Sequence, residues 1–177
     1  MRTFYLGVLG AGVLVGSFLI TLWLTEPTTP PDIKPAPPSI KSDIFAAYLV
    51  RDERTLPAAA NAAGLKPSDK LKGVVDTVTR LDSAQVRIDG WAVDLHGENG
   101  PIAVVVFADG ENVLKAYTKG PRPDVADALK LSQDAASNVA FEGLLACKPG
   151  KPLFVVAVTQ TDLYAALGHA RPLICPS

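Results

Sequence analysis

The amino-acid sequence predicts a mainly β protein: an immunoglobulin-like β-sandwich of about seven strands with one short helix, preceded by a single transmembrane helix. Three observations support this prediction. A long uncharged apolar segment lies near the N-terminus, a proline-rich stretch follows it, and six short runs rich in Val, Ile, Thr and aromatic residues occur after residue 73. Short strands at regular spacing, with turn residues between them, favour a sandwich. A chain of 177 residues has room for one such domain and its N-terminal extensions.

The composition argues against several classes of protein. With 17 basic and 18 acidic residues the net charge is -1, whereas a sequence-independent nucleic-acid binder needs a basic stripe of Lys and Arg. Two histidines and two cysteines, scattered along the sequence, are too few for a typical zinc or haem site. We therefore expect no cofactor, no metal and no nucleic-acid partner.

Residues 6–24 are predicted to form a transmembrane anchor. The segment has 19 residues without a charge, and as an α-helix it would cover roughly 28 Å, close to the ~30 Å hydrocarbon core of a bilayer. It is longer than the apolar core of a cleaved signal peptide, about 7–15 residues, and no small-x-small cleavage site follows it. Arg2 precedes the segment and Glu26 follows it. The positive-inside rule therefore places residues 1–5 in the cytoplasm and the domain in the periplasm of a bacterial inner membrane.

Small residues occur at a fixed spacing within this anchor. Gly12 and Gly16 form a GxxxG pair, and Gly7 and Ala11 form a second pair with the same spacing. Such pairs let two membrane helices approach closely, so we interpret them as a candidate contact with an integral membrane protein. Glycine is also common in membrane helices in general, and the sequence leaves both interpretations open.

Residues 25–41 are predicted to form an extended stalk. They contain six prolines, and proline fixes φ and removes a backbone donor, which favours polyproline II structure. At ~3.1 Å per residue such a spacer would reach about 50 Å.

Residues 42–72 are predicted to form a short helical segment. A helix over 43–54 would carry one apolar face, Pro57 would end it, and the alanine-rich stretch after Pro57 predicts a second short turn. The apolar face consists of Ile44, Phe45, Tyr48 and Leu49. This face either packs on the following domain or docks on a membrane partner or on the bilayer surface.

The predicted sandwich occupies residues 73–177. Its strands are expected at 74–79, 85–93, 102–108, 113–118, 139–145 and 153–159. Asp109-Gly110 predicts a two-residue hairpin, and Asp124 after Pro123 predicts a helix at 124–131. The third and sixth strands are almost continuously apolar, which is typical of central strands covered on both faces, with the helix over 43–54 as the outer cover.

Cys147 and Cys175 are predicted to form a disulfide, because an exported domain would fold in an oxidising compartment. Closing this loop would stabilise the domain by about 3–4 kcal/mol in the chain-entropy model. It would also fasten a last strand near residues 172–175 to the sheet. The alternative is a pair of buried thiols.

Three short segments occur in a fixed order: Asp-Gly-Trp-Ala-Val-Asp at 89–94, Val-Phe-Ala-Asp-Gly at 106–110 and Arg-Pro-Asp-Val at 122–125. This order resembles a small alphaproteobacterial β-sandwich module, with Gly-Trp-Ala-x-Asp and Arg-Pro-Asp motifs, that is found beside glycosyltransferase and other cell-surface polysaccharide domains. The resemblance covers residues 73–160, and Ala140-Phe141 stands where the module has Gly-Phe. It implies an accessory role, in contact with glycans or with a neighbouring protein. The matching residues are Asp89, Gly90, Trp91, Asp94, Asp109, Gly110, Arg122, Pro123 and Asp124.

These motif residues have two interpretations. In the first, Trp91 is the core tryptophan of the sandwich, and Arg122 pairs with Asp94 or Asp124 and holds the turn. In the second, Trp91 is a platform on which a sugar stacks, and four charged residues form a polar binding edge: Asp89, Asp94, Asp109 and Arg122. The sequence favours the structural interpretation for Trp91 and for Arg122.

The sequence contains no GxSxG elbow, no HExxH, no P-loop and no GxGxxG after a strand. Asp94, His96 and Glu98 have the residue types of a cation site, although a polar turn between two strands is the favoured interpretation. We therefore predict a non-catalytic accessory or scaffolding subunit of an inner-membrane assembly, with an integral membrane protein and the lipid bilayer as partners. The alternative is a membrane-tethered carbohydrate- or envelope-binding module, and a small periplasmic enzyme is the third hypothesis. The aromatic residues available for glycan contact are Tyr117, Phe141 and Tyr164.

Overall fold

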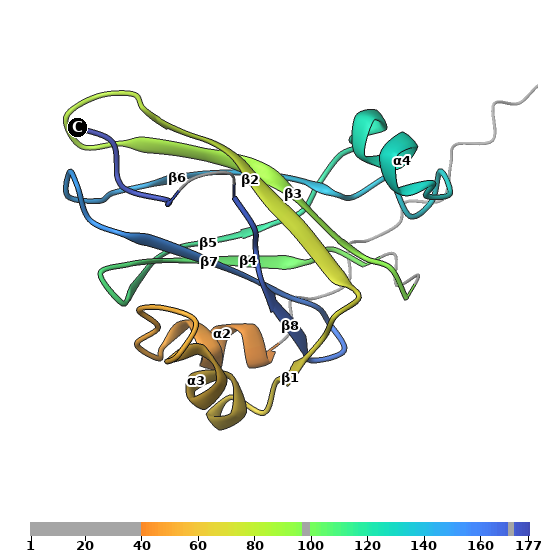
Figure 1. Cartoon of the computed structure of the whole chain (residues 1–177), viewed down its shortest axis with the longest axis horizontal. Helices are drawn as coiled ribbons and strands as arrows, with labels where there is room; N and C mark the ends of the chain where they lie inside the picture. Colours follow the sequence, from red (N-terminus) through yellow and green to blue (C-terminus); the bar gives the residue numbers. More distant parts are fainter. Residues whose placement is uncertain (1–39, 97–99, 170–171) are drawn as a thin grey trace, which may run out of the picture. The chain divides into compact units, whose positions relative to one another are not determined.

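The computed structural model describes residues 40–96, 100–169 and 172–177 (Figure 1). The expected cytoplasmic N-terminus, the transmembrane anchor and nearly all of the stalk lie outside these residues. In the described part the chain is mainly β, and residues 40–177 belong to one compact unit. The helices are α2 (Ile40–Ala46), α3 (Leu56–Ala62) and α4 (Pro123–Leu129); the strands are β1 (Lys66–Pro67), β2 (Leu71–Arg80), β3 (Val86–Asp94), β4 (Ala103–Ala108), β5 (Glu111–Tyr117), β6 (Ala140–Leu145), β7 (Leu153–Val158) and β8 (Leu163–Ala166).

The strands of this described part form two sheets. One sheet has five strands in the order β1-β8-β7-β4-β5, and the other has three in the order β2-β3-β6. Neighbouring strands are antiparallel except for the short pair β1 and β8. The predicted two-sheet, mainly β architecture is therefore confirmed, and the six predicted runs correspond to β2 to β7 with every end within three residues of its expected position. The prediction lacks β1 and β8, because strands of two and four residues are too short to show a period-two pattern.

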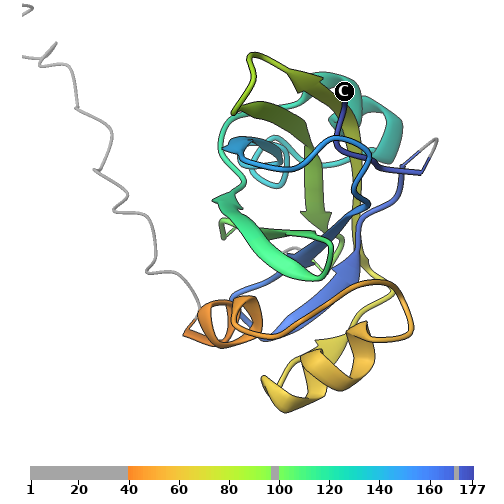
Figure 2. The same cartoon turned by 90° about the vertical axis from the view of Figure 1, so that its left-hand side faces the viewer.

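The two strands with nearly continuous apolar sequence lie inside the five-stranded sheet and are covered on both faces. In β4, Val104 and Val106 face the three-stranded sheet, whereas Val105 and Phe107 face α2 and α3. The residues of β7 alternate in the same way. Figures 1 and 2 show the resulting layers, with α2 and α3 on one side of the five-stranded sheet and β2, β3 and β6 on the other. The predicted cover on both faces of these strands is confirmed.

The helix α2 covers the outer face through Phe45, whose side chain is fully buried. Its ring meets the ring of Phe107 edge to face, with the centroids 5.5 Å apart. The helix α3 adds Leu56, Ala59 and Ala60 to the same core. The domain boundary expected at residue 73 falls inside β2, because the helical segment shares this core with the sheet.

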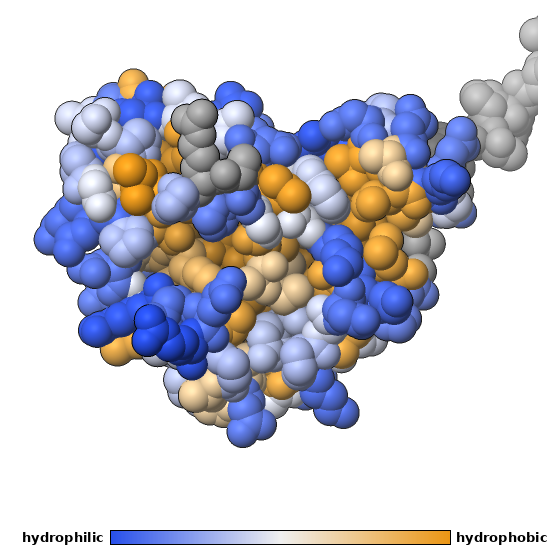
Figure 3. All heavy atoms as spheres, viewed as in Figure 1, coloured by the Kyte–Doolittle hydropathy of each residue, from blue (hydrophilic) through white to orange (hydrophobic). Residues whose placement is uncertain are grey.

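The helix α4 begins one residue before the predicted helix and ends two residues earlier. Pro123 suits its first turn, since the N–H that proline lacks has no intrahelical partner there. Lys130 ends the helix in the left-handed conformation, with φ 54°. Val125 is buried beneath the helix, and Figure 3 shows hydrophobic residues on the surface over it. The helix therefore packs through Val125, while Asp124 and Asp127 are exposed on its outer side.

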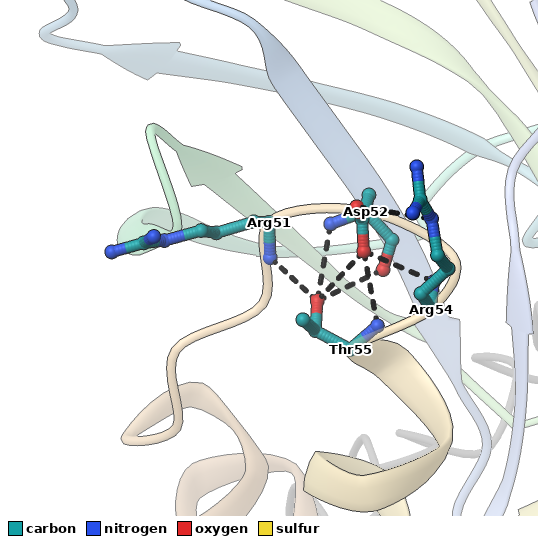
Figure 4. A network of polar contacts seen from close by, with 4 residues as sticks. All are labelled: Arg51, Asp52, Arg54 and Thr55. Carbon is teal, nitrogen blue, oxygen red and sulfur yellow. Dashed lines mark hydrogen bonds and ion pairs between the residues drawn. The ribbon is translucent and has the colours of Figure 1, made fainter.

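The helix α2 ends at Ala46, eight residues before the end of the predicted helix. Local polar contacts in the segment that follows compete with helical hydrogen bonds (Figure 4). The Thr55 hydroxyl oxygen accepts the N–H groups of Arg51 and Asp52, at 2.9 and 3.2 Å. In return, a carboxylate oxygen of Asp52 accepts the N–H groups of Arg54 and Thr55, each at 3.0 Å. These contacts fold the segment into a turn, so the helix predicted over 43–54 is too long.

The hairpin predicted between β4 and β5 is confirmed. Ala108 pairs with Glu111, which leaves Asp109 and Gly110 as the two loop residues. Their φ angles are 54° and 94°. A type I′ turn needs positive φ at both central residues, which is the reason for the Asp-Gly preference.

The predicted disulfide is also confirmed. Cys147 and Cys175 are bonded, with their Cα atoms 6.0 Å apart. The bond joins the chain after β6 to the C-terminal segment. That segment pairs through an isolated bridge between Pro152 and Ile174, so the prediction of a last strand at 172–175 is wrong. Two prolines flank the segment, and proline cannot donate the hydrogen bonds that a strand needs.

Candidate functional site

A shallow cavity of about 230 Å³ lies on the outer face of the three-stranded sheet, beside the segment that follows β5. We call it the sheet cavity. Backbone bonds from Lys119 to Ala140 and from Ala140 to Gly120 hold that segment along the start of β6. The residues that line the cavity are Arg87, Asp89, Gly90, Lys119, Arg122, Ala140, Phe141 and Glu142. Strands β3 and β6 therefore form the floor, and the segment after β5 forms one wall.

The floor carries charges because β3 alternates. Val86 and Ile88 point into the core between the sheets, so Arg87 and Asp89 point outward. Asp89 is paired across the strands with Glu142. The Arg87 Nε atom lies 3.3 Å from a Glu142 carboxylate oxygen and 3.9 Å from one of Asp89. Two carboxylates and one guanidinium thus lie side by side on this face.

The wall is held by Arg122, whose guanidinium bonds three carboxylate oxygens. Its Nε and Nη2 atoms donate to the two oxygens of Asp124, at 2.8 and 2.7 Å, and its Nη1 atom donates to Asp76 at 2.6 Å. Asp76 is the extra residue of a bulge between Val75 and Thr77, and such bulges redirect a side chain. The predicted pairing of Arg122 with Asp124 is confirmed, and the pairing with Asp94 is wrong.

We expect this pairing to make the stability of the chain depend on acid pH. Hydrogen bonding to Arg122 lowers the pKa of Asp124 from 3.8 to about 2. Its contribution is therefore fully present above pH 3.8 and is lost as the pH falls through 2. Wild type should unfold at a higher urea concentration than Asp124→Asn at pH 6, and the two midpoints should converge near pH 2.

The matched control for this prediction is Asp127→Asn on the same helix, for which we expect no such difference. A gap between wild type and Asp124→Asn that persists unchanged at pH 2 would contradict the role given to the carboxylate charge.

Trp91 lies on the outer face of the three-stranded sheet and belongs to neither apolar core of the described residues. Its neighbours Gly90 and Ala92 are buried on the inner side, so Trp91 points outward and is partly exposed. Phe141 fills the space beneath Gly90, where an added Cβ would lie 2.7 Å from the ring. The prediction that Trp91 is the core tryptophan is wrong, because β6 supplies the aromatic residue at this point of the core.

The three aromatic residues expected for glycan contact are mostly covered. Phe141 and Tyr164 are 2% and 7% exposed, so they are core residues. Tyr117 is half-buried, and the Lys115 ammonium lies 5.5 Å from its ring centroid. Trp91, in contrast, is partly exposed and lies two residues after Asp89 on the same face of β3.

Asp94 does not belong to the sheet cavity. It is 3% exposed, and one carboxylate oxygen accepts the His96 N–H at 2.9 Å. No described residue donates to its other oxygen. Glu98 lies outside the described residues, and among those described no three His, Cys, Asp or Glu side chains lie close enough to hold a metal ion.

Asp109 lies in the β4–β5 hairpin, also away from the cavity. Its carboxylate pairs with Lys151 at 2.8 Å, and this contact lowers the pKa of Asp109. The predicted polar edge is therefore divided: Asp89 and Arg122 line one cavity, and Asp94 and Asp109 lie elsewhere.

No family model, curated protein or solved structure matches this chain. The resemblance to the polysaccharide-associated module therefore stays a prediction.

The expected docking face of the first helix is split by the fold. Phe45 lies in the core, whereas Ile44, Tyr48 and Leu49 are 45%, 36% and 60% exposed. Val50, directly after them, is again fully buried. Ile44 is thus presented to solvent before the buried anchor Phe45, and Tyr48 and Leu49 are presented between Phe45 and the second anchor, Val50. Their docking role stays a prediction.

The expected membrane contact through Gly7, Ala11, Gly12 and Gly16 lies outside the described residues. Within the described ranges no helix is both long enough and apolar enough to cross a bilayer.

Four charged residues of the sheet cavity and its wall were missing from the sequence-based interpretation: Asp76, Arg87, Lys119 and Glu142. Alternation in β3 would have put Arg87 beside Asp89, but Glu142 joins them only through the register of β3 with β6. Asp76 reaches Arg122 through a bulge, and no residue type in β2 signals its position.

Proposed function

We propose that this chain is a non-catalytic accessory or scaffolding subunit of an inner-membrane assembly, and that it presents an immunoglobulin-like sandwich in the periplasm. The single observation that supports this most is the exposed apolar trio of Ile44, Tyr48 and Leu49. The trio lies within the first ten described residues, directly after the predicted anchor and stalk. It is therefore close in sequence to the place where a membrane-bound partner would be found.

The trio has the character of the centre of an interface. Scattered exposed apolar residues are normal on a protein surface, but these three occur within six consecutive residues. The residues that follow at 51–54 are all charged and exposed, which resembles the polar rim of an interface.

The segment is also held in place before any partner binds. Phe45 and Val50 fix it to the core, Lys41 pairs with Asp162 at 2.5 Å, and Lys115 pairs with Asp43. A preorganised surface loses less side-chain and backbone freedom on binding.

The test is a pull-down of the full-length chain from its native membrane in mild detergent, followed by mass spectrometry. Wild type should recover an integral membrane protein in stoichiometric amount. Ile44→Ser/Leu49→Ser should reduce that recovery about tenfold or more, because each buried leucine-sized side chain contributes roughly 1.5–3 kcal/mol.

Two exposed leucines elsewhere provide the matched control. Leu81 and Leu144 are 53% and 50% exposed, and Leu81→Ser/Leu144→Ser should leave recovery unchanged. The proposal is wrong if wild type is recovered without any partner protein, or if both double variants lose the partner equally.

The sheet cavity supports a second candidate, a membrane-tethered carbohydrate- or envelope-binding module. Asp89 and Glu142 offer acceptors and Lys119 and Arg122 offer donors around one cavity, which suits a polyol whose hydroxyl groups both donate and accept. Trp91 adds a partly exposed ring on the same face.

A glycan screen of the full-length protein in detergent tests this candidate. Binding should be detected with wild type, should fall about tenfold in Asp89→Asn and in Glu142→Gln, and should be unchanged in the exposed control Asp69→Asn. If no glycan in the screen binds, this candidate function is excluded, and the accessory-subunit proposal is unaffected.

A further inference from the structure

The two sulfur atoms of the disulfide lie in different surroundings. Cys175 is 1% exposed and belongs to the core between the sheets. Cys147 is partly exposed and lines a second cavity, of about 570 Å³, together with Lys148 and Lys151. A reagent that approaches from solvent therefore meets the sulfur of Cys147 first.

The buried sulfur atom has a cation beside it. Arg80 Nη2 donates to the Cys175 sulfur at 3.6 Å. The same guanidinium is fixed by the carbonyl oxygen of Pro176, which accepts from Nε at 2.9 Å and from Nη2 at 2.5 Å, and by the carbonyl oxygens of Asp82 and Ser83. A fixed positive charge favours a thiolate over a thiol.

We propose that the Cys147–Cys175 disulfide is a directional site of thiol exchange, with Cys147 as the sulfur that is attacked and Cys175 as the leaving thiolate. The substrate is a thiol-containing reductant. Its thiolate enters the second cavity and attacks the Cys147 sulfur. Exchange is faster when the leaving thiolate is better stabilised, and Arg80 provides that stabilisation at Cys175.

The step is balanced in atoms and electrons. A bond forms between the incoming sulfur and Cys147 as the Cys147–Cys175 bond breaks, and the electron pair of the broken bond goes to Cys175. The negative charge moves from the incoming thiolate to Cys175, and no proton is transferred. A second thiolate of the reductant then attacks the sulfur that is now bound to Cys147. The two reductant sulfurs leave as a disulfide, and Cys147 is released as a thiolate.

The C-terminal segment is held independently of the disulfide, so the exchange is reversible. The N–H of Cys175 donates to the Lys151 carbonyl at 2.8 Å, its carbonyl accepts from Gly150 at 2.9 Å, and Leu153 donates to Leu173 at 2.9 Å. These bonds keep Cys175 beside Cys147 after the sulfur–sulfur bond has opened. The Cys175 thiolate is thereby positioned to displace the added thiol again.

The first test maps the attacked sulfur. The oxidised, folded full-length protein in detergent is mixed with reduced glutathione at neutral pH. The reaction is then quenched with N-ethylmaleimide in denaturant, so that the buried Cys175 thiol is also labelled, and the peptides are analysed by mass spectrometry. We expect glutathione on Cys147 and maleimide on Cys175, about tenfold more often than the reverse pattern. Equal labelling, the reverse pattern, or reaction only after the protein is unfolded would overturn the proposal.

The second test measures the role of Arg80. Arg80→Gln should slow adduct formation about fivefold, whereas Arg80→Lys keeps the charge and should restore most of the rate. Lys72→Gln, at an exposed position of the same strand β2, is the matched control and should react like wild type. Circular dichroism verifies that the variants are folded. If Arg80→Gln is not folded, the rate of Arg80→Lys and the labelling pattern of wild type still test the proposal. Equal rates in folded Arg80→Gln and wild type would exclude the role of the guanidinium.

Discussion

Phe45→Ala is expected to lower the free energy of unfolding by about 3–5 kcal/mol, the range for removing a buried aromatic side chain from a core. Phe45 is fully buried between α2 and the five-stranded sheet, and its ring meets Phe107 edge to face. Its removal deletes the largest side chain that α2 places in the core and leaves a cavity beside Phe107. Urea unfolding of the full chain, followed by circular dichroism, measures the change.

Ile44→Ala is the matched control for this prediction, because Ile44 is the preceding residue of the same helix and is 45% exposed. We expect it to change the free energy of unfolding by no more than about 0.5 kcal/mol, the usual range for surface positions. If both variants are destabilised equally, α2 does not depend on Phe45 to pack on the sheet.

Gly90→Ala is expected to cost about 3 kcal/mol, at the upper end of the range for overpacking. An added Cβ at Gly90 would lie 2.2 Å from the carbonyl oxygen of Val74 and 2.7 Å from the Phe141 ring. The ring is buried, and the carbonyl belongs to the neighbouring strand of the same sheet, so relief requires β2 to move away from β3. Thermal unfolding of the purified chain is the measurement.

Gly168→Ala is the control, since an added Cβ there meets only the Gly73 carbonyl oxygen, at an ordinary 3.6 Å. We expect its melting temperature to stay close to that of wild type. A Gly90→Ala chain as stable as Gly168→Ala would show that the three-stranded sheet has room to adjust, contrary to the close approach described above.

The parts of the fold that depend on local sequence were predictable. Runs of β-branched residues predicted β2 to β7, and Asp109-Gly110 predicted the hairpin because few other residue pairs adopt positive φ twice. The continuous apolar sequence of β4 and β7 predicted cover on both faces, because each face of such a strand needs an apolar neighbour.

The parts that depend on register were not predictable. Trp91 alternates with Ile88, Gly90 and Ala92 in the same way as Arg87 and Asp89, so its side chain lies on the outer face. Its size favoured a place in the core, but Phe141 of β6 occupies that place. Arg122 bonds Asp76, which lies 46 positions earlier in the sequence and is the extra residue of the bulge in β2. The length of the first helix was overestimated because Asp52 and Thr55 satisfy backbone groups that a helix would otherwise use.

The layer formed by α2 and α3 is synthesised before the strands that support it. Phe45 and Leu56 share their core with β4 and β7, and β1 pairs with β8, the last strand described in the chain. Because a chain emerges from its N-terminus at about 5–20 residues per second, these apolar faces stay uncovered for several seconds after they leave the ribosome. The domain therefore completes folding only when its C-terminal strands have emerged. In a nascent chain that ends before β8, the apolar faces of α2 and α3 stay accessible to chaperones and to aggregation.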